Sequence, residues 1–236
     1  MTWSIIVKDP KTGLFGIAVA TRFFAVGALV PHASAKGAVA TQALVNPTYA
    51  PRGLRLLGEG VASEMVVATL VGLDAGREHR QLHLMDAAGR SARWTGAACI
   101  DWCGHVAVEN VSLAGNMLAG PAVLDATLEA WLAGTDLPLV ARLIAAMRVG
   151  QARGGDKRGE QSAAILVQGP EPWPRLSLRV DDHAEPLDEL ERLYRVAKER
   201  FLPFSAAFPK SEHDPGIFDR AWIEAMIPEA AGGDEL

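Results

Sequence analysis

A threonine in the second position of the chain can do chemistry that the same residue cannot do elsewhere. Aminopeptidases remove Met1 when the next residue is small, which would leave Thr2 with a free α-amine beside its own hydroxyl. The amine has an unperturbed pKa of about 7.7–8.0, so a useful fraction is neutral at cellular pH. A neutral amine can take the hydroxyl proton and activate a weak nucleophile. Thr2 is therefore a candidate catalytic residue; the alternative is a chain that begins Met-Thr and uses its terminus for nothing.

The residues after Thr2 predict a strand that would hold such a nucleophile rigidly. In TWSIIVK, residues 2–8, β-branched and aromatic side chains alternate, and the turn DPKTG follows. The run LFGIAVAT, residues 14–21, predicts a second strand that pairs with the first as a hairpin. Chain ends are usually frayed, so a terminus that enters a sheet at once is consistent with a catalytic support.

The remaining patterns predict further hairpins and helical pairs. Strand character is found in GAVATQALV, RQLHLMDAAGRSARWTG (a hairpin), VAVENVSLAGN, SAAILVQ and RLSLRVDD. Helices are expected in PRGLRLLGEG, MVVATLVGL capped by Ser63 and Glu64, PAVLDATLEAWLAG, LPLVARLIAAMRVGQA, PLDELERLYRVAKERF and a short segment near 219–226. This order fits an α+β protein, a four-layer αββα sandwich of two antiparallel sheets with helices outside. We expect one domain, residues 1–236, with a mobile tail at 229–236.

The loop GGDKRGEQS, residues 154–162, collects polar side chains before a buried strand. No Lys-Ser/Thr pair and no helix follow it, so it is a poor phosphate loop. A solvated helix-to-strand connection is the simple interpretation. The other is a substrate-binding loop, in which Asp156, Arg158 and Gln161 hold carboxylate or amide groups and the guanidinium is the bidentate partner of a carboxylate.

The segment AGNMLAGP, residues 114–121, is expected where a strand ends and a helix begins. Backbone N–H groups there and the Asn116 amide could stabilise the oxyanion of a tetrahedral intermediate. A turn satisfied by the asparagine side chain is the alternative. Arg22, His32 and Gln42 lie near the first hairpin and are candidate substrate-binding residues, although His32 beside Pro31 also fits a purely structural histidine.

Composition limits the classes of partner. The chain of 236 residues carries a formal charge of −5, which argues against a sequence-independent nucleic-acid binder and gives no sign of attraction to an anionic membrane. No signal peptide or membrane span is expected. Cys99 and Cys103 are too few for a disulfide framework and lack the paired C-x₂-C spacing of zinc sites, so we expect free thiols, no metal and no cofactor. A cytoplasmic location follows as an expectation.

Several blocks of the sequence together resemble an uncharacterised family of the N-terminal-nucleophile (Ntn) hydrolase superfamily. They are GIAVATRFFAVGALVPHA, GAVATQALVNPTYAPRGLRLL, REHRQLHLMDAAGR with TGAAC, AGNMLAGPAVLDA, GGDKRGEQSAA and LRVDDH, which lie within about residues 2–185. For the superfamily, the resemblance implies an αββα sandwich and hydrolysis of an amide bond. It favours the binding interpretation of the 154–162 loop.

These observations predict an N-terminal-threonine amidohydrolase that acts on a small carboxylate-bearing amide through an acyl-enzyme. Thr2 would be the nucleophile and Asn116 a second catalytic residue; Arg22, His32, Gln42, Asp156, Arg158 and Gln161 would bind substrate. The alternative is a non-catalytic binding or structural protein that keeps the sandwich, because fold alone does not settle function. A small molecule is the expected partner, and a homo-oligomer is compatible with the amphipathic helix at 186–201.

Overall fold

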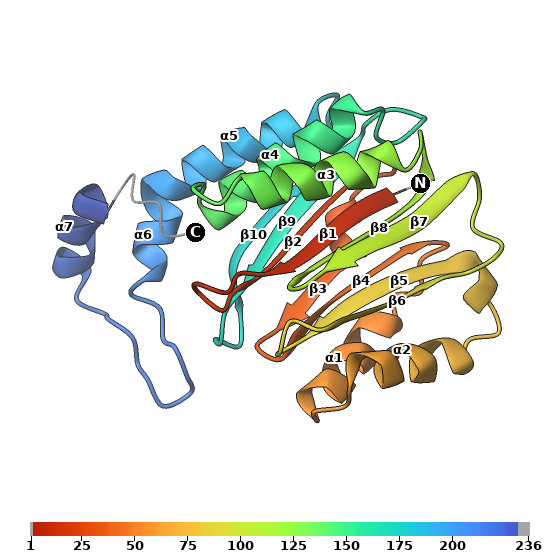
Figure 1. Ribbon diagram of the computed structural model, residues 1–236. Coiled ribbons are helices and arrows are strands. Elements are labelled where there is room, and N and C mark those ends of the chain that lie inside the picture. Colours follow the sequence, from red (N-terminus) through yellow and green to blue (C-terminus); the bar gives the residue numbers. More distant parts are fainter. Residues whose placement is uncertain (1, 231–236) are drawn as a thin grey trace.

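The computed structural model describes residues 2–230, which form two antiparallel sheets (Figure 1). The larger sheet has six strands, in the order β10 (Pro174–Val180), β9 (Ser162–Gln168), β2 (Phe15–Thr21), β1 (Thr2–Lys8), β8 (Val111–Leu118) and β7 (Trp102–Val108). The smaller has four, in the order β3 (Pro31–Ser34), β4 (Gly37–Ala43), β5 (Arg80–Asp86) and β6 (Ser91–Thr95). The expected α+β class with two antiparallel sheets is confirmed.

Helices lie on the outer face of each sheet, and the inner faces of the sheets lie against each other (Figure 1). Over the six-stranded sheet are α3 (Ala122–Ala133), α4 (Leu139–Ala152) and α5 (Pro186–Val196); over the four-stranded sheet are α1 (Tyr49–Gly58) and α2 (Ser63–Gly72). Short turns are η1 (Val26–Ala28), η2 (Arg77–His79) and the π-helical turn η3 (Ala197–Phe201), followed by α6 (Leu202–Ser205) and α7 (Arg220–Ala230). In Figure 1, α6 and α7 lie at one end of the molecule, beyond β10.

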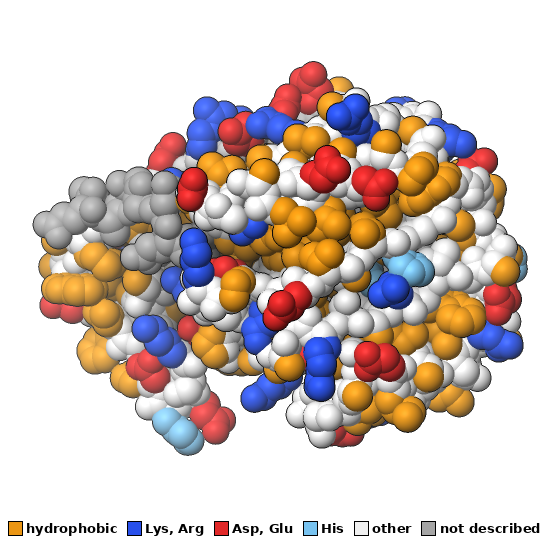
Figure 2. Space-filling model, in the orientation of Figure 1, with side chains coloured by type: hydrophobic (Ala, Val, Ile, Leu, Met, Phe, Trp, Pro, Cys, Tyr) orange, Lys and Arg blue, Asp and Glu red, His pale blue; other side chains and the backbone are white. Residues whose placement is uncertain are grey.

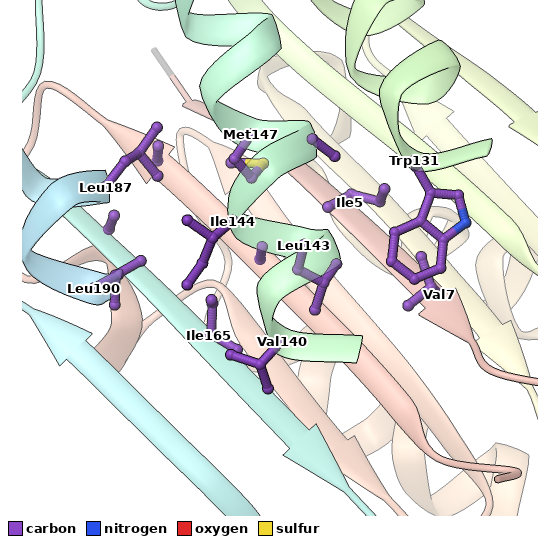
Figure 3. Close-up of a cluster of buried hydrophobic side chains, with 14 of the residues drawn as sticks. Ile5, Val7, Trp131, Val140, Leu143, Ile144, Met147, Ile165, Leu187 and Leu190 are labelled. Carbon is purple, nitrogen blue, oxygen red and sulfur yellow. The ribbon is translucent and has the colours of Figure 1, made fainter. Parts of the chain in front are cut away.

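Strand β1 is paired on both edges because it lies in the middle of the larger sheet, and it is buried on both faces because helices cover one face and the smaller sheet covers the other. Its side chains alternate with period two. Ile5 and Val7 point toward the helices, where they join α4 residues such as Leu143 (Figure 3). Ile6 points the other way and packs between the sheets with Ile17 and other apolar residues.

The hairpin of β1 and β2 is confirmed, and so are the hairpin of β5 and β6 and the helical pairs.

Three local expectations differ from the structure. The run from residue 102 to 118 is itself a hairpin, β7–β8, and β8 continues through Asn116 to Leu118, so this asparagine lies in a strand and not in a turn. The short strand β3 was not expected. Ser63 is the first residue of α2, not its cap, and its hydroxyl donates to the Glu64 side chain. Of the tail predicted at 229–236, residues 231–236 lie outside the described residues.

Charged groups are mixed on the surface. On the face shown in Figure 2, acidic and basic side chains are interspersed and neither sign gathers in one region. None of the helices in residues 2–230 combines the length and apolar character needed to cross a bilayer.

The close approach of α4 to β1 generates a stability prediction. Gly150 of α4 lies over the fully buried Trp3, and an added Cβ would come within 2.7 Å of the indole ring and also meet Thr127. We expect Gly150→Ala to lower the free energy of unfolding by about 1–3 kcal/mol, because overpacking outweighs the gain in helix propensity.

The matched control is Gly72→Ala at the exposed end of α2, where an added Cβ meets nothing within 4 Å. It should leave stability unchanged or raise it by up to about 1 kcal/mol. Urea unfolding of both variants decides the point, and equal effects would mean that α4 does not pack on Trp3 as described.

Candidate active site

The register of the first hairpin places two threonines face to face. Trp3 pairs with Ala20 and Ser4 with Val19, so the partner of Thr2 one step further along is Thr21. The Oγ atoms of Thr2 and Thr21 are 3.1 Å apart, within hydrogen-bond distance. On its other side, Thr2 pairs with Asn116 of β8. Thr2 is therefore held between two strands at the first position of β1.

The side chain of Thr2 points into the space between the sheets. It shares a face of β1 with Ser4 and Ile6, opposite to the helix-facing Trp3. Its backbone carbonyl accepts two hydrogen bonds, one from the Asn116 Nδ2 at 3.3 Å and one from the Gln42 Nε2 at 3.4 Å. Because Gln42 comes from β4 of the smaller sheet, both sheets hold the position of Thr2.

Gln81 of β5 connects these two amides. Its Oε1 accepts from the Gln42 Nε2 at 2.7 Å and from the Asn116 Nδ2 at 3.0 Å. Its own Nε2 donates to the carbonyls of Gly115 at 2.9 Å and Gly104 at 3.1 Å, which belong to β8 and β7. The side chain is completely buried, so each of these bonds forms away from water. Gln81 thus fixes the positions of the two amides that donate to the Thr2 carbonyl.

A buried histidine extends the network. The Nε2 of His83 lies 2.8 Å from the Ser4 Oγ, and its Nδ1 lies 3.0 Å from the Ser112 Oγ. The Ser4 hydroxyl also donates to the Gln42 Oε1 at 2.7 Å, which links the histidine to the amides. Burial, and to a smaller extent the charge of His105, lowers the pKa of His83 to about 3, against 6.5 for an ordinary histidine. His83 is therefore neutral and structural at cellular pH.

A small pocket opens beside Thr2. Its volume is about 70 Å³. Apart from Thr2 and Gln42, its walls are apolar: Phe23, Val26, Leu29, Val30, Ala43 and Val45. They come from the segment after β2, including η1, and from the end of β4. Thr2 itself is 7% exposed, and its place in the lining makes this pocket a route by which a ligand could reach it.

The backbone around this pocket carries local strain. Ala25, Ala43 and Met117 have φ of 54°, 68° and 55°, in the left-handed region that residues with a Cβ seldom adopt. Ala43 lines the pocket, and Met117 follows Asn116. Such strain persists only where the surrounding structure imposes it and tends to gather at functional sites.

The 156–161 loop is fixed to the end of β2. The buried Asp156 carboxylate accepts from the backbone N–H groups of Arg22 at 2.7 Å and Arg158 at 2.8 Å. The Arg158 guanidinium also binds this carboxylate, at 3.2 Å. The Gln161 N–H donates to the Thr21 carbonyl at 3.0 Å. Asp156 therefore positions the chain directly after Thr21.

The structure brings some of the expected site residues to Thr2 and places others elsewhere. Asn116 and Gln42 contact Thr2 directly. Asp156 and Arg158 lie on the adjoining 156–161 loop. Arg22, directly after β2, contacts this loop, with its exposed guanidinium close to the carbonyls of Arg158 and Glu160.

Two expected residues point away from this group. The Gln161 side chain donates to Asp182 at 3.1 Å. His32 pairs with Val39, whose side chain packs on the α1 side, so it faces the outer layer; burial lowers its pKa.

Sequence reasoning missed Thr21, Gln81, His83 and Ser4. Thr21 had a signal: counting back from the turn at residues 9–13 places it opposite Thr2. Gln81 and His83 had only their alternation within a predicted strand, which indicates a shared face but not a partner. Cys99 and Cys103 are free and half-buried, and no group of three metal-ligating side chains occurs in the described part of the chain.

Fold and site together define an α+β protein of two facing antiparallel sheets with a buried polar site at the start of its first strand. The chain belongs to DUF1028, a family of unknown function whose model matches residues 2–190. A similar solved structure is the crystal structure of protein SPO2555 from Silicibacter pomeroyi, assigned to the same family. It is 34% identical, with a TM-score of 0.86, covering 93% of this chain and 96% of that one. No curated protein matches the chain.

The buried histidine generates a prediction on pH. The unfolded chain binds a proton at His83 near pH 6.5, whereas the folded chain does so only near pH 3. As the pH falls below 6.5, the unfolded chain takes up a proton at His83 that the folded chain does not. The free energy of unfolding therefore falls, by up to about 1.4 kcal/mol per pH unit, and is unaffected by protonation of His83 above pH 6.5. We expect His83→Gln to be less stable at pH 7 but to lose less stability between pH 6.5 and 4.5.

The exposed His213 supplies the control, since His213→Gln should leave the pH dependence of urea unfolding unchanged. If His83→Gln kept the native slope as well, the histidine would not be held neutral by its burial.

Proposed function

We propose that this protein is an N-terminal-threonine amidohydrolase of the Ntn type, which cleaves an amide bond in a small carboxylate-bearing substrate. The observation that carries the proposal is the position of Thr2: first residue of a central strand, hydrogen-bonded to Thr21 and lining a pocket. The arrangement of helices outside two facing antiparallel sheets supports it, because it is the αββα sandwich expected of Ntn hydrolases.

In the proposed reaction, removal of Met1 gives Thr2 a free α-amine. The amine takes the hydroxyl proton as Oγ attacks the carbonyl carbon of the amide. The tetrahedral intermediate collapses, the C–N bond breaks, and the proton passes from the ammonium to the leaving amine. Water then attacks the Thr2 ester, again losing a proton to the α-amine. The ester bond breaks, Oγ recovers the proton, and a carboxylic acid is released.

The geometry refines the role of Asn116. Both hydrogens of its amide already have acceptors, the Thr2 carbonyl and the Gln81 Oε1. We therefore assign it the positioning of the nucleophile, together with Gln42, in preference to binding the oxyanion. Rigid placement of the attacking atom is itself a large catalytic effect.

Arg22 and Arg158 are the groups that would bind the substrate carboxylate. The Arg22 guanidinium is exposed at the end of β2, one residue beyond Thr21, and its described contacts are to backbone carbonyls. A guanidinium can bind a carboxylate in a bidentate manner. Arg158 is shared with Asp156, so Arg22 is the stronger candidate.

Substitution of Thr2 tests the chemistry. We expect Thr2→Ala to fold normally, because the bonds to the Thr2 carbonyl remain, yet to lose turnover of N-acylglycines by about 10³-fold or more. Thr2→Ser keeps the hydroxyl and the amine and should retain part of the activity. Release of glycine is the assay, and Thr69→Ala, a half-buried threonine on α2, is the control. Full activity of Thr2→Ala would exclude the proposal.

Blocking the amine tests the base. Protein with additional residues ahead of Met1 should have a normal unfolding curve and no turnover, because the Thr2 nitrogen is then a peptide and cannot accept the proton. The same tag placed at the C-terminus is the control, with intact mass confirming that Met1 has been removed. Equal activity of the two forms would show that the amine is not the base.

A further inference from the structure

The pocket beside Thr2 restricts the substrate further. We infer that it is the acyl subsite and that it accepts a short, uncharged aliphatic group, so that the substrate carboxylate lies on the leaving-amine side. This inference rests on the proposed function and names the substrate class: amides of short aliphatic acids with a carboxylate-bearing amine.

The first argument is chemical. No Asp, Glu, Lys or Arg lines this pocket among the described residues, and six of its eight lining residues are apolar. Burial of a carboxylate there without a partner would be strongly unfavourable. A hydrocarbon chain would instead gain the free energy of leaving water.

The second argument is that the polar amide in the wall is already used. The Gln42 Nε2 donates to the Thr2 carbonyl, to the Gln81 Oε1 at 2.7 Å and to the Ala114 carbonyl at 3.1 Å. Its Oε1 accepts from the Ser4 hydroxyl at 2.7 Å. A polar ligand group would have to break this buried network. The other polar residue in the described lining is Thr2, the proposed nucleophile, whose Oγ lies 3.1 Å from the Thr21 Oγ.

The third argument is size. About 70 Å³ is little more than twice the volume of one water molecule in the liquid, so the pocket has room for about two to four carbon atoms. Phe23 at the rim is 57% exposed, a large aromatic surface that a bound aliphatic chain would partly cover. Acyl groups from acetyl to butyryl should fit, and an aromatic or long chain should not.

The carboxylate must then bind outside the pocket. The exposed Arg22 directly precedes the rim residue Phe23, and its backbone N–H donates to the Asp156 carboxylate. A leaving amine such as an amino acid would carry its carboxylate toward this guanidinium, while the acyl chain occupies the pocket. The apolar pocket would thus bind the acyl chain, and the Arg22 guanidinium would bind the carboxylate of the leaving amine.

The test compares two substrates with four-carbon acyl chains, N-butyrylglycine and N-succinylglycine, which differ in a methyl against a carboxylate at the end of the acyl chain. We expect kcat/KM to favour butyryl by about 30-fold or more, because the succinyl carboxylate would be buried without a partner, and to fall again for N-octanoylglycine. Equal rates for the butyryl and succinyl compounds, or a preference for octanoyl, would overturn the inference while leaving the hydrolase itself established.

A positive charge introduced into the pocket provides a second test of the acyl subsite. Val45 is half-buried, so in Val45→Lys the ammonium can stay close to water, and this variant should reverse the preference toward N-succinylglycine. Leu73→Lys adds the same charge at the exposed end of α2 and should keep the native preference. Unchanged preference in Val45→Lys would contradict the assignment of this pocket.

Binding separates the two hypotheses. Calorimetric titration of the Thr2→Ala protein with N-butyrylglycine and N-succinylglycine reports the subsite without turnover. Selective binding of the butyryl compound, with no hydrolysis by the native protein, would support the subsite and reject the proposed activity. Hydrolysis by the native protein without selective binding of the butyryl compound would support the proposed activity and reject the subsite.

Discussion

The structure depends on a buried amide, Gln81, whose hydrogen bonds must all be satisfied inside the protein. It receives bonds from one residue of each sheet, Gln42 and Asn116, and donates to the carbonyls of two neighbouring strands. A buried polar group without a partner costs about 1–3 kcal/mol, so only one relative position of the sheets is favourable. Since Gln42 and Asn116 also bind the Thr2 carbonyl, the same constraint fixes the candidate nucleophile.

The space between the sheets is divided into two parts with different physical roles. Ile6, Ile17 and Met85 form an apolar part that contributes stability through burial. Toward the start of β1, this layer becomes polar, with His83 held between two serine hydroxyls. A fully satisfied polar network contributes geometric precision more than net stability, which is what a site at the end of a strand requires.

Local patterns predicted most of the fold, because alternation and turn residues specify hairpins within one stretch of chain. Thr2 was proposed as a site residue from its residue type and position, and its contact with Thr21 follows from hairpin counting. The bond from Gln42 to Gln81 could be expected only in part, because pairing between β4 and β5 spans two helices. Nothing local shows that β5 faces β8, so the roles of Gln81 and His83 required the structure. His32 illustrates the converse: its residue type suggested chemistry, but register turns it toward the outer helices.

The central claim is that Thr2 is a reactive N-terminal nucleophile. Its most direct measurement is labelling with an electrophilic β-lactone, followed by intact mass and peptide mapping of native and Thr2→Ala protein. The account predicts loss of Met1 and a single ester adduct on Thr2, absent from the variant. A protein that retains Met1, or that carries its label on another residue, would contradict it.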